Sequence, residues 1–448
     1  MNTDSKPAFS RRRFVASAGL VAGTMITRPL FGADAPSNKL NILLIGVWGR
    51  GLAHYDSLSD ENVVALCDVN EKRFPDALKR FPNATTYVDW RKALDHKGLD
   101  AVVICTADHT HAFIASWALN RNLHVYCEKP LAITVNEARA VRAKWEQKKG
   151  KLATQVGMQR HAHANFNRVR ELIRDGAIGD LQAAYAWGNR QIRKSGYLPA
   201  EGQPPEGFNY DLWLGPAPFR PYNPGYFSGS AGANCLQWNM FWDFGAGQIG
   251  DMGSHTMDIV WNAVDAKLPT AVSAKGEAFN SDVTPVECES HFEHPANDWR
   301  GPITVSWYQG GVMPRSPKPV IDLTKIGHGA MFKGSKGFLI SDFDSRMVIP
   351  FGDDADLTYY KPRTKETLIP PVGHFQKEWL AACREPGKKT SCDFGYSADM
   401  IEQMLLGLVA YRVGKKISYD PKTGKSPDTP EADTFMGKQY REGWSMDG

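Results

Sequence analysis

The chain carries the apolar run LNILLI from Leu40 to Ile45, and the glycine-rich turn GVWGRG follows it at once from Gly46 to Gly51. The residues from Leu52 onward suit a helix, and a second apolar run then ends at Asp68. Short, continuous apolar runs are typical of strands that are buried on both faces of a parallel sheet. The order of strand, glycine turn, helix, strand and acid predicts a βαβ unit that binds a nucleotide.

Each part of this unit has a role in dinucleotide binding. Gly46 suits the tight turn out of the strand, and Gly51 lets the next helix pack closely on the sheet. A helix N-terminus there offers N–H groups to a pyrophosphate. Asp68 follows Gly46 by 22 residues, where a carboxylate accepts both ribose hydroxyls and repels a 2′-phosphate. The sequence therefore predicts NAD as the cofactor, with NADP less favoured.

The turn departs from the usual pattern G-x-G-x-x-G at Trp48, which stands where the middle glycine lets the backbone approach the phosphates. Three explanations stay open. The indole points away, Gly49 replaces the missing glycine in a shifted turn, or nucleotide binding is altered. A βαβ unit that binds no nucleotide is the alternative interpretation.

Length and composition limit the classes of protein. A chain of 448 residues is too long for one compact core, so we expect two domains. The content of 42% hydrophobic and 23% charged residues is ordinary for a soluble globular protein. A net charge of +4 without a basic stripe argues against a nucleic-acid partner. The seven cysteines form no C-x-x-C pair, which favours buried free thiols.

Residues 1–35 are expected to be a twin-arginine signal peptide, because SRRRFV at Ser10–Val15 matches the consensus S-R-R-x-F-x. The apolar stretch after it is too short and too rich in glycine for a stable membrane span, and small residues at 33–35 suit cleavage. We therefore expect a periplasmic protein that the twin-arginine machinery exports in its folded state. The alternative is a basic, disordered N-terminus. An exported NAD enzyme must hold its cofactor tightly and restore it within each turnover.

Three further motifs occur in order along the chain. The predicted strands at 100–105 and 123–127 end in TADHTH at Thr106–His111 and in EKP at Glu128–Pro130, and GAGQIGDMGSHTMD spans 245–258. These motifs resemble those of the glucose–fructose oxidoreductase / inositol dehydrogenase (Gfo/Idh/MocA) family. Its signatures are EKP, TPxxxH and G-G-G-x-x-x-D-x-G-x-H-x-x-D. An alanine stands here where TPxxxH has proline.

The resemblance implies a fold and a domain organisation. It predicts an α/β protein with a Rossmann dinucleotide-binding domain at residues 38–157. A C-terminal α+β substrate and oligomerisation domain, with a large and mainly antiparallel open sheet, is predicted at 158–448. A homo-oligomer built on that sheet is a further expectation of the family.

The resemblance also implies the catalytic residues. Lys129 would lie beside the nicotinamide and the reacting hydroxyl, where an ammonium stabilises developing negative charge. His255 would be the general base, with Asp251 as its helper or as a substrate ligand. These two residues are four apart and share one face if helical. The alternatives are a histidine that is hydrogen-bonded in the core and a solvated lysine. The implied cofactor-binding residues are Gly46, Trp48, Gly49, Arg50, Gly51, Asp68, Thr106, His109, His111, Glu128 and Lys129.

The segment 188–244 is rich in proline, glycine and aromatic residues, which predicts little regular structure beside the catalytic motif. Aromatic faces pack well on sugar rings, so this segment indicates a carbohydrate substrate. A loop held by its own aromatic residues, or a subunit contact, is the competing interpretation. The predicted substrate-binding residues are Gln159, Arg160, Trp238, Trp242, Asp251 and His255.

We predict no metal site, because the histidine pairs at 109–111 and 291–294 match no standard ligand spacing. The sequence as a whole predicts an NAD(P)-dependent oxidoreductase that acts on a CH–OH group of a sugar, glycoside or cyclitol, with tightly bound NAD recycled in the site. One alternative is an NAD-dependent, redox-assisted glycosidase or lyase. The other is a non-catalytic periplasmic sugar-binding protein on the same scaffold.

Overall fold

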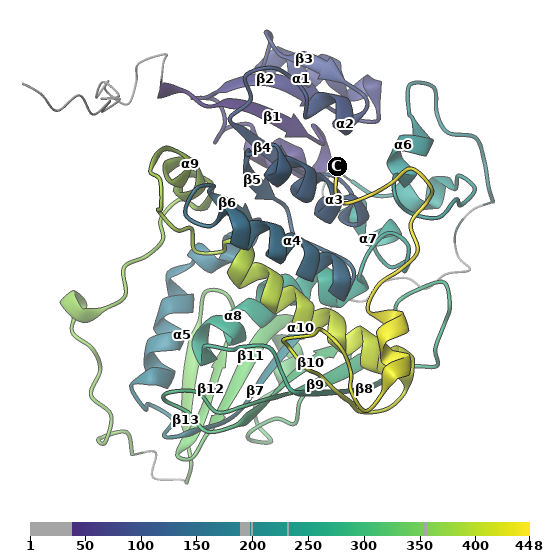
Figure 1. Cartoon of the computed structure of the whole chain (residues 1–448). Helices are drawn as coiled ribbons and strands as arrows, with labels where there is room; N and C mark the ends of the chain where they lie inside the picture. Colours follow the sequence, from purple (N-terminus) through teal and green to yellow (C-terminus); the bar gives the residue numbers. More distant parts are fainter. Residues whose placement is uncertain (1–37, 189–197, 199, 231–232, 353–355) are drawn as a thin grey trace, which may run out of the picture. The chain divides into compact units, whose positions relative to one another are not determined.

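The computed structural model describes residues 38–188, 198, 200–230, 233–352 and 356–448 (Figure 1). The predicted signal peptide lies outside these residues. Within them the chain forms a six-stranded and an eight-stranded sheet, which confirms the predicted fold class. Among the described helices, none combines the length and the apolar character that a membrane crossing needs.

The six-stranded sheet is parallel and has the strand order β3-β2-β1-β4-β5-β6. Its central strand is the apolar run of the glycine motif, and Leu43 and Leu44 on that strand are fully buried. Chain order reverses beside β1, which creates the crevice where α/β proteins bind ligands. The strands are β1 (Asn41–Ile45), β2 (Asn62–Cys67), β3 (Thr85–Tyr87), β4 (Ala101–Ile104), β5 (His124–Cys127) and β6 (Thr154–Val156). The helices of this part are α1 (Phe74–Arg80), α2 (Trp90–Ala93), α3 (Asp108–Asn120) and α4 (Val135–Lys148).

The helix expected after the glycine turn is a six-residue 3₁₀ helix, Gly49–His54, followed by turns. The serine hydroxyls in those turns bond to backbone carbonyls: Ser57 donates to His54 at 2.9 Å and Ser59 to Asp56 at 2.8 Å. Side chains that compete for backbone groups in this way favour turns over a continued helix. The expectation of a regular helix here was therefore wrong, and a phosphate at the turn gains little from a helix dipole.

The eight-stranded sheet has the order β13-β12-β11-β7-β10-β9-β8-β14. Its neighbouring strands run antiparallel except for the pair β7 and β10, which is parallel, so the prediction of a mainly antiparallel sheet is confirmed. The strands are β7 (Leu181–Gly188), β8 (Ala271–Gly276), β9 (Cys288–His294), β10 (Ile303–Gln309), β11 (His328–Gly334), β12 (Gly337–Ser341), β13 (Arg346–Pro350) and β14 (Ile417–Ser418).

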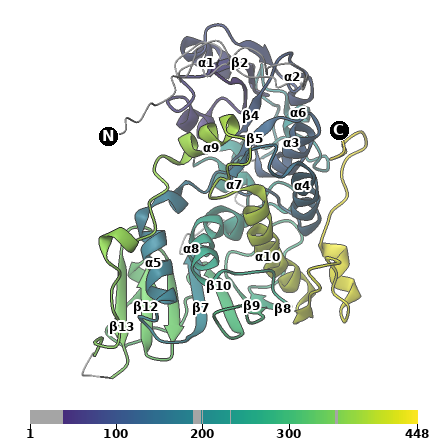
Figure 2. The same ribbon diagram turned by 60° about the vertical axis from the view of Figure 1, so that its left-hand side comes forward.

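One helix joins the two sheets. α10 (Phe394–Val413) contacts α4 on one side and strands β8 and β9 on the other, and Figures 1 and 2 show it in this position. Such a helix must be apolar on all sides, and the run from Met400 to Ala410 is buried throughout. The remaining helices of this part are α5 (Ala164–Arg174), α6 (Tyr210–Leu214), α7 (Cys235–Trp238), α8 (Ser254–Val264) and α9 (Phe375–Arg384).

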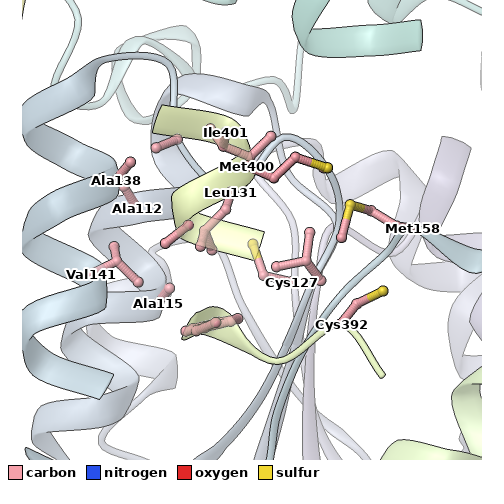
Figure 3. Packing of buried hydrophobic residues seen from close by; sticks show 14 of the residues in the cluster. Ala112, Ala115, Cys127, Leu131, Ala138, Val141, Met158, Cys392, Met400 and Ile401 are labelled. Atoms are coloured by element: carbon pink, nitrogen blue, oxygen red, sulfur yellow. The ribbon is translucent and has the colours of Figure 1, made fainter. Parts of the chain in front are cut away.

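Small and flexible side chains fill the space around α10. Figure 3 shows Met400 and Ile401 of this helix close to Leu131, which follows β5, and to Cys127 at the end of β5. Ala138 of α4 is among the fully buried residues of the same cluster. Protein interiors are close-packed, and close packing holds the elements of a fold in one arrangement. The chain after β5 is thus fixed relative to α10 and to the second sheet.

The C-terminal tail returns to the first sheet. Trp117 of α3 donates its indole N–H to the carbonyl of Ser445 at 2.8 Å. Arg441 donates to the carbonyl of Gly215 at 2.8 Å and to the carboxylate of Asp211 at 2.6 Å. The tail therefore ties the segment around α6 to the helix that follows β4.

Candidate active site

A cavity of about 600 Å³ lies at the carboxyl ends of the first strands of the parallel sheet and extends to the start of α8. Its size is in the range of small-molecule and cofactor sites. Most of the predicted site residues line it. They are Gly46, Trp48, Gly49, Arg50, Asp68, Thr106, His111, Glu128, Lys129, Gln159, Arg160, Trp238, Asp251 and His255.

The glycine turn is as tight as the sequence predicts. Gly46 has φ +83°, and a Cβ there would lie 2.5 Å from the carbonyl oxygen of Cys105. A Cβ at Gly51 would lie 2.0 Å from the carbonyl oxygen of Gly46. Gly51 does not line the cavity itself. Its part in the turn is to let the chain pass close to the end of β1.

Trp48 is accommodated without strain. Its backbone is extended, with φ −123° and ψ 175°, while Gly49 takes the positive φ of +63°. The guanidinium carbon of Arg73 lies 3.9 Å from the centre of the indole ring, a cation–π contact. One of the three explanations therefore applies, because Gly49 supplies the left-handed residue of a shifted turn. The indole packs against Arg73 and still borders the cavity.

Asp68 lies at the end of β2 and borders the cavity. Its carboxylate accepts N–H groups from Val47 at 3.0 Å and Asn70 at 2.9 Å. Burial raises the pKa of Asp68 to about 6, although these two hydrogen bonds oppose the shift. The carboxylate is anchored to the glycine turn and still faces the cavity, as recognition of a ribose requires.

Glu128 locks the glycine turn to the end of β5. Its carboxylate accepts hydrogen bonds from Arg50 Nε at 2.9 Å and from His54 Nε2 at 2.8 Å. Burial alone would raise the pKa of Glu128, but Arg50 and His54 outweigh it and lower that pKa to about 2. Glu128 is therefore a charged link between β5 and the residues that follow β1.

The two histidines at the start of α3 have different surroundings. His111 lines the cavity, and its Nδ1 lies 2.7 Å from the carbonyl oxygen of Pro130. His109 does not line it. Its Nε2 lies 2.9 Å from the carbonyl oxygen of Trp213, and its ring packs against Phe244. Burial lowers the pKa of His109 to about 3, so this ring is neutral and connects α3 to the aromatic segment.

Lys129 and Asp251 form a buried ion pair in the cavity wall, with side-chain exposures of 17% and 6%. The lysine follows β5, and the aspartate sits in a π-helical turn, Ile249–Gly253, directly before α8. Burial alone would lower the pKa of Lys129, but the carboxylate of Asp251 opposes this and the net shift is upward. The ammonium thus stays charged where a substrate oxygen can meet it.

His255 is the second residue of α8 and is 5% exposed. Burial, followed by the charge of Lys129, lowers its pKa to about 3, so the imidazole is neutral at neutral pH. Within the described residues, its Nδ1 has no hydrogen-bond partner. A neutral imidazole has a ring nitrogen that can accept a hydrogen bond from a bound hydroxyl, which is the position that a proton acceptor needs.

The sequence interpretation gave no role to Asp108, which also lines the cavity and is 7% exposed. Burial raises the pKa of Asp108 well above its usual value. The charge of Lys129 opposes this shift and that of Asp251 adds to it. This carboxyl group is therefore protonated more readily than an exposed aspartate. Its place as the first residue of α3, at the carboxyl end of β4, was the available signal.

The aromatic segment has little regular structure among its described residues, as predicted, and it packs largely on itself. Tyr210 stacks on Trp213 with ring centres 5.7 Å apart. Several of its rings also line the cavity: Phe208, Trp213, Tyr222, Phe227 and Trp238. Trp242 does not; it donates to the carbonyl of Asn280 at 2.9 Å. The segment is therefore both a self-packed loop and a wall of the cavity.

Two buried groups bring possible metal ligands together: His54, Cys105 and Glu128, and also His161, Asp258 and Cys392. Hydrogen bonds and ion pairs already account for both. Glu128 is held by Arg50 and His54, and Asp258 accepts from His161 at 2.9 Å and from Tyr396. The histidine pairs noted in the sequence are in neither group.

Comparison with protein families identifies both parts of the chain. The model of the oxidoreductase family with an NAD-binding Rossmann fold, Gfo/Idh/MocA, matches residues 40–157. The model of the C-terminal alpha/beta domain of the same family matches residues 167–288. The chain belongs to the Gfo/Idh/MocA family. Together the two matches cover more than half of this family member.

Curated relatives of this Gfo/Idh/MocA protein match over part of their length. Inositol 2-dehydrogenase of Salmonella typhimurium is 35% identical over 146 residues, which are 32% of this chain and 43% of that enzyme. A glycosyl hydrolase family 109 protein of Stenotrophomonas maltophilia is 27% identical over 230 residues, 47% of this chain and 48% of that protein. The match thus spans less than half of the length of these relatives.

Solved structures share the fold of this family member over most of its length. An NAD-binding protein from Listeria innocua has a TM-score of 0.56 and 16% identity, and covers 85% of this chain and 97% of its own. The WlbA dehydrogenase from Chromobacterium violaceum, solved with NADH and UDP-GlcNAcA, has a TM-score of 0.60 and 14% identity. It covers 89% of this chain and 99% of its own.

The residues at the glycine turn fit NAD. The carboxylate of Asp68 accepts a hydrogen bond from Val47 in the glycine turn, where a Cβ at Gly46 would clash with the backbone. The cavity continues from this turn to Lys129 and His255. This is the Rossmann arrangement, with the ribose acceptor at the end of β2 and the reactive groups farther along. NAD is accordingly the cofactor of this protein.

Replacing Trp48 with alanine removes the cation–π contact with Arg73 and leaves the extended backbone unchanged. Exposed cation–π contacts contribute about 0.5–1 kcal/mol. We expect NAD to bind roughly 2- to 5-fold more weakly, measured by calorimetry on nucleotide-free protein. Trp299→Ala is the matched control, because Trp299 makes the same kind of cation–π contact outside the cavity. The guanidinium carbon of Arg174 lies 4.8 Å from the centre of its ring. Equal NAD affinity in both variants would show that the Trp48–Arg73 contact does not support the cofactor site.

Proposed function

We propose that this protein is an NAD-dependent oxidoreductase that acts on a CH–OH group of a sugar, glycoside or cyclitol. One observation carries the proposal. An ammonium, its carboxylate partner and a neutral imidazole, from Lys129, Asp251 and His255, line the same cavity as the Rossmann turn and Asp68. Alcohol oxidation needs a group that binds the oxygen and a group that takes its proton, and both stand here beside the cofactor site.

The roles of the residues follow from their charges. Lys129 donates a hydrogen bond to the substrate oxygen and stabilises the negative charge that develops as the O–H bond breaks. Asp251 keeps the ammonium in place. His255 takes the hydroxyl proton. Bound NAD supplies the acceptor for the hydride that leaves the same carbon. The aromatic wall is suited to the C–H faces of a sugar ring.

Two variants test this assignment. Lys129→Met removes the ammonium, and His255→Asn removes the proton acceptor, while each roughly preserves the volume. We expect each to lower the rate of NAD reduction by about 10²- to 10⁴-fold, as for other lost acid–base groups. The assay follows NADH absorbance with myo-inositol, aldoses and their methyl glycosides.

Lys149→Met is the control, because Lys149 packs on Trp145 away from the cavity. NAD content should remain equal in all three variants. Wild-type protein that holds NAD and binds sugars without ever reducing the cofactor would instead support the sugar-binding alternative.

A second candidate function is glycoside cleavage without net oxidation. The relative named as a glycosyl hydrolase family 109 protein and the favoured protonated form of Asp108 both point to it. Oxidation of a ring carbon to a ketone acidifies the adjacent C–H bond. Loss of that proton expels the glycosidic oxygen, which takes a proton from an acid. Water then adds to the double bond, and the hydride returns to the ketone carbon. Asp108 is the proposed acid.

Asp108→Asn separates the two reactions. A poor leaving group such as methanol needs protonation, whereas p-nitrophenolate does not. We expect the variant to lose at least about 10-fold more activity on methyl glycosides than on p-nitrophenyl glycosides, while transient NADH formation is unchanged. Equal losses on both glycosides would exclude Asp108 as the acid that protonates the leaving group.

We also propose that the segment SRRRFV directs periplasmic export, and its support is the match to the twin-arginine consensus. Replacing Arg11 and Arg12 with lysine should leave the protein in the cytoplasmic fraction of the expressing bacterium. Arg13→Lys changes only the variable position of the consensus and should be exported. Export of the double variant would show that another route is used.

A further inference from the structure

The positive charges of the cavity are not all balanced by carboxylates of the residues that the structure describes. Four cationic side chains line it. Arg50 pairs with Glu128, Lys129 pairs with Asp251, and Arg73 stacks on Trp48 near Asp68. The fourth cation is Arg160. Within the described residues, no hydrogen bond or ion pair engages its guanidinium.

Arg160 is held close to the catalytic histidine. It belongs to the 3₁₀ turn Gln159–Ala162 that follows β6. Its guanidinium carbon lies 4.1 Å from the centre of the Phe343 ring, and the edge of His255 meets the same ring with centres 6.4 Å apart. The phenyl ring therefore fixes the unpaired cation on the side of the cavity where the reacting hydroxyl is expected.

The charges around His255 do not neutralise this guanidinium. Asp251 is already paired with Lys129, and burial favours the protonated form of Asp108. The guanidinium cannot lose its proton, and its planar pair of N–H donors matches a carboxylate. Beside it, Oε1 of Gln159 is buried, lines the same cavity, and has no hydrogen-bond partner in the described part of the chain. This oxygen is available to accept a hydroxyl.

We propose that the substrate is an acidic sugar, a uronic or aldonic acid unit, whose carboxylate binds Arg160 while a ring hydroxyl of the same unit meets Lys129 and His255. The proposal rests on the proposed function for the identity of the reacting hydroxyl. A carboxylate is favoured over a phosphate monoester because its single negative charge matches one guanidinium. A phosphate monoester carries a net charge of about −2 and would need further cations.

The experiment measures binding and oxidation separately on the full chain loaded with NAD. Binding of D-glucuronate, D-galacturonate, D-glucuronamide, D-glucose and glucose 6-phosphate is followed by tryptophan fluorescence, because tryptophans line the cavity. Oxidation of the same compounds is followed by NADH absorbance. We expect a uronate to bind at least about 10-fold more tightly than the uncharged amide, as a charge-assisted hydrogen bond implies.

Arg160→Gln tests the anchor. We expect it to weaken binding of the uronate roughly 10- to 100-fold and to leave binding of the amide unchanged. Arg412→Gln is the matched control, because Arg412 also stacks on a phenyl ring, that of Phe435 at 4.3 Å, but does not line the cavity. Equal melting temperatures and NAD contents establish that both variants are folded.

The outcomes separate this inference from the proposed function. Tight uronate binding that depends on Arg160 supports the inference, even if no compound reduces NAD and the proposed oxidation fails. Oxidation of glucose or the amide as readily as the uronate overturns the inference and leaves the oxidoreductase function standing. Preferred binding of glucose 6-phosphate, or no binding by any compound, also overturns it.

Discussion

The buried ion pair between Lys129 and Asp251 constrains the rest of the structure. Taking two charges out of water costs several kcal/mol per ion unless they meet in good geometry. The lysine follows β5 of the parallel sheet, whereas the aspartate precedes α8 of the second part. The two parts must therefore dock in one arrangement, and α10 provides the apolar contact that holds it. An ion pair made from two parts of the chain depends on this packing.

Charge compensation divides the cavity into regions with different tasks. At the glycine turn, Glu128 is paired with Arg50 and hydrogen-bonded to His54, which makes that end a rigid anchor. Around His255, Asp251 is paired with Lys129, burial raises the pKa of Asp108, and no described residue pairs with the guanidinium of Arg160. A fixed positive field beside a neutral imidazole favours deprotonation of a bound hydroxyl, because the product is an anion.

Local patterns in the sequence predicted the fold, and most of the site residues predicted from these patterns and from the family resemblance line the cavity. The apolar runs specify the strands, and the glycines specify the turn, because both requirements are local. His109 and Trp242 could not be placed in this way. Each is near its motif along the chain, but contacts with Trp213 and Asn280 turn them away from the cavity. Asp108 was missed for the opposite reason, since the rise in its pKa depends on burial that only the assembled structure creates.

Trp48 illustrates how a departure from a motif can conserve its physical purpose. The middle glycine is needed where a side chain would separate backbone from phosphate. Here Gly49 carries the positive φ, and the indole packs against Arg73 at the border of the cavity. The ring and the guanidinium add contact area beside Asp68 that a glycine would not offer. The substitution that weakens the motif as a pattern can therefore strengthen the site that the motif builds.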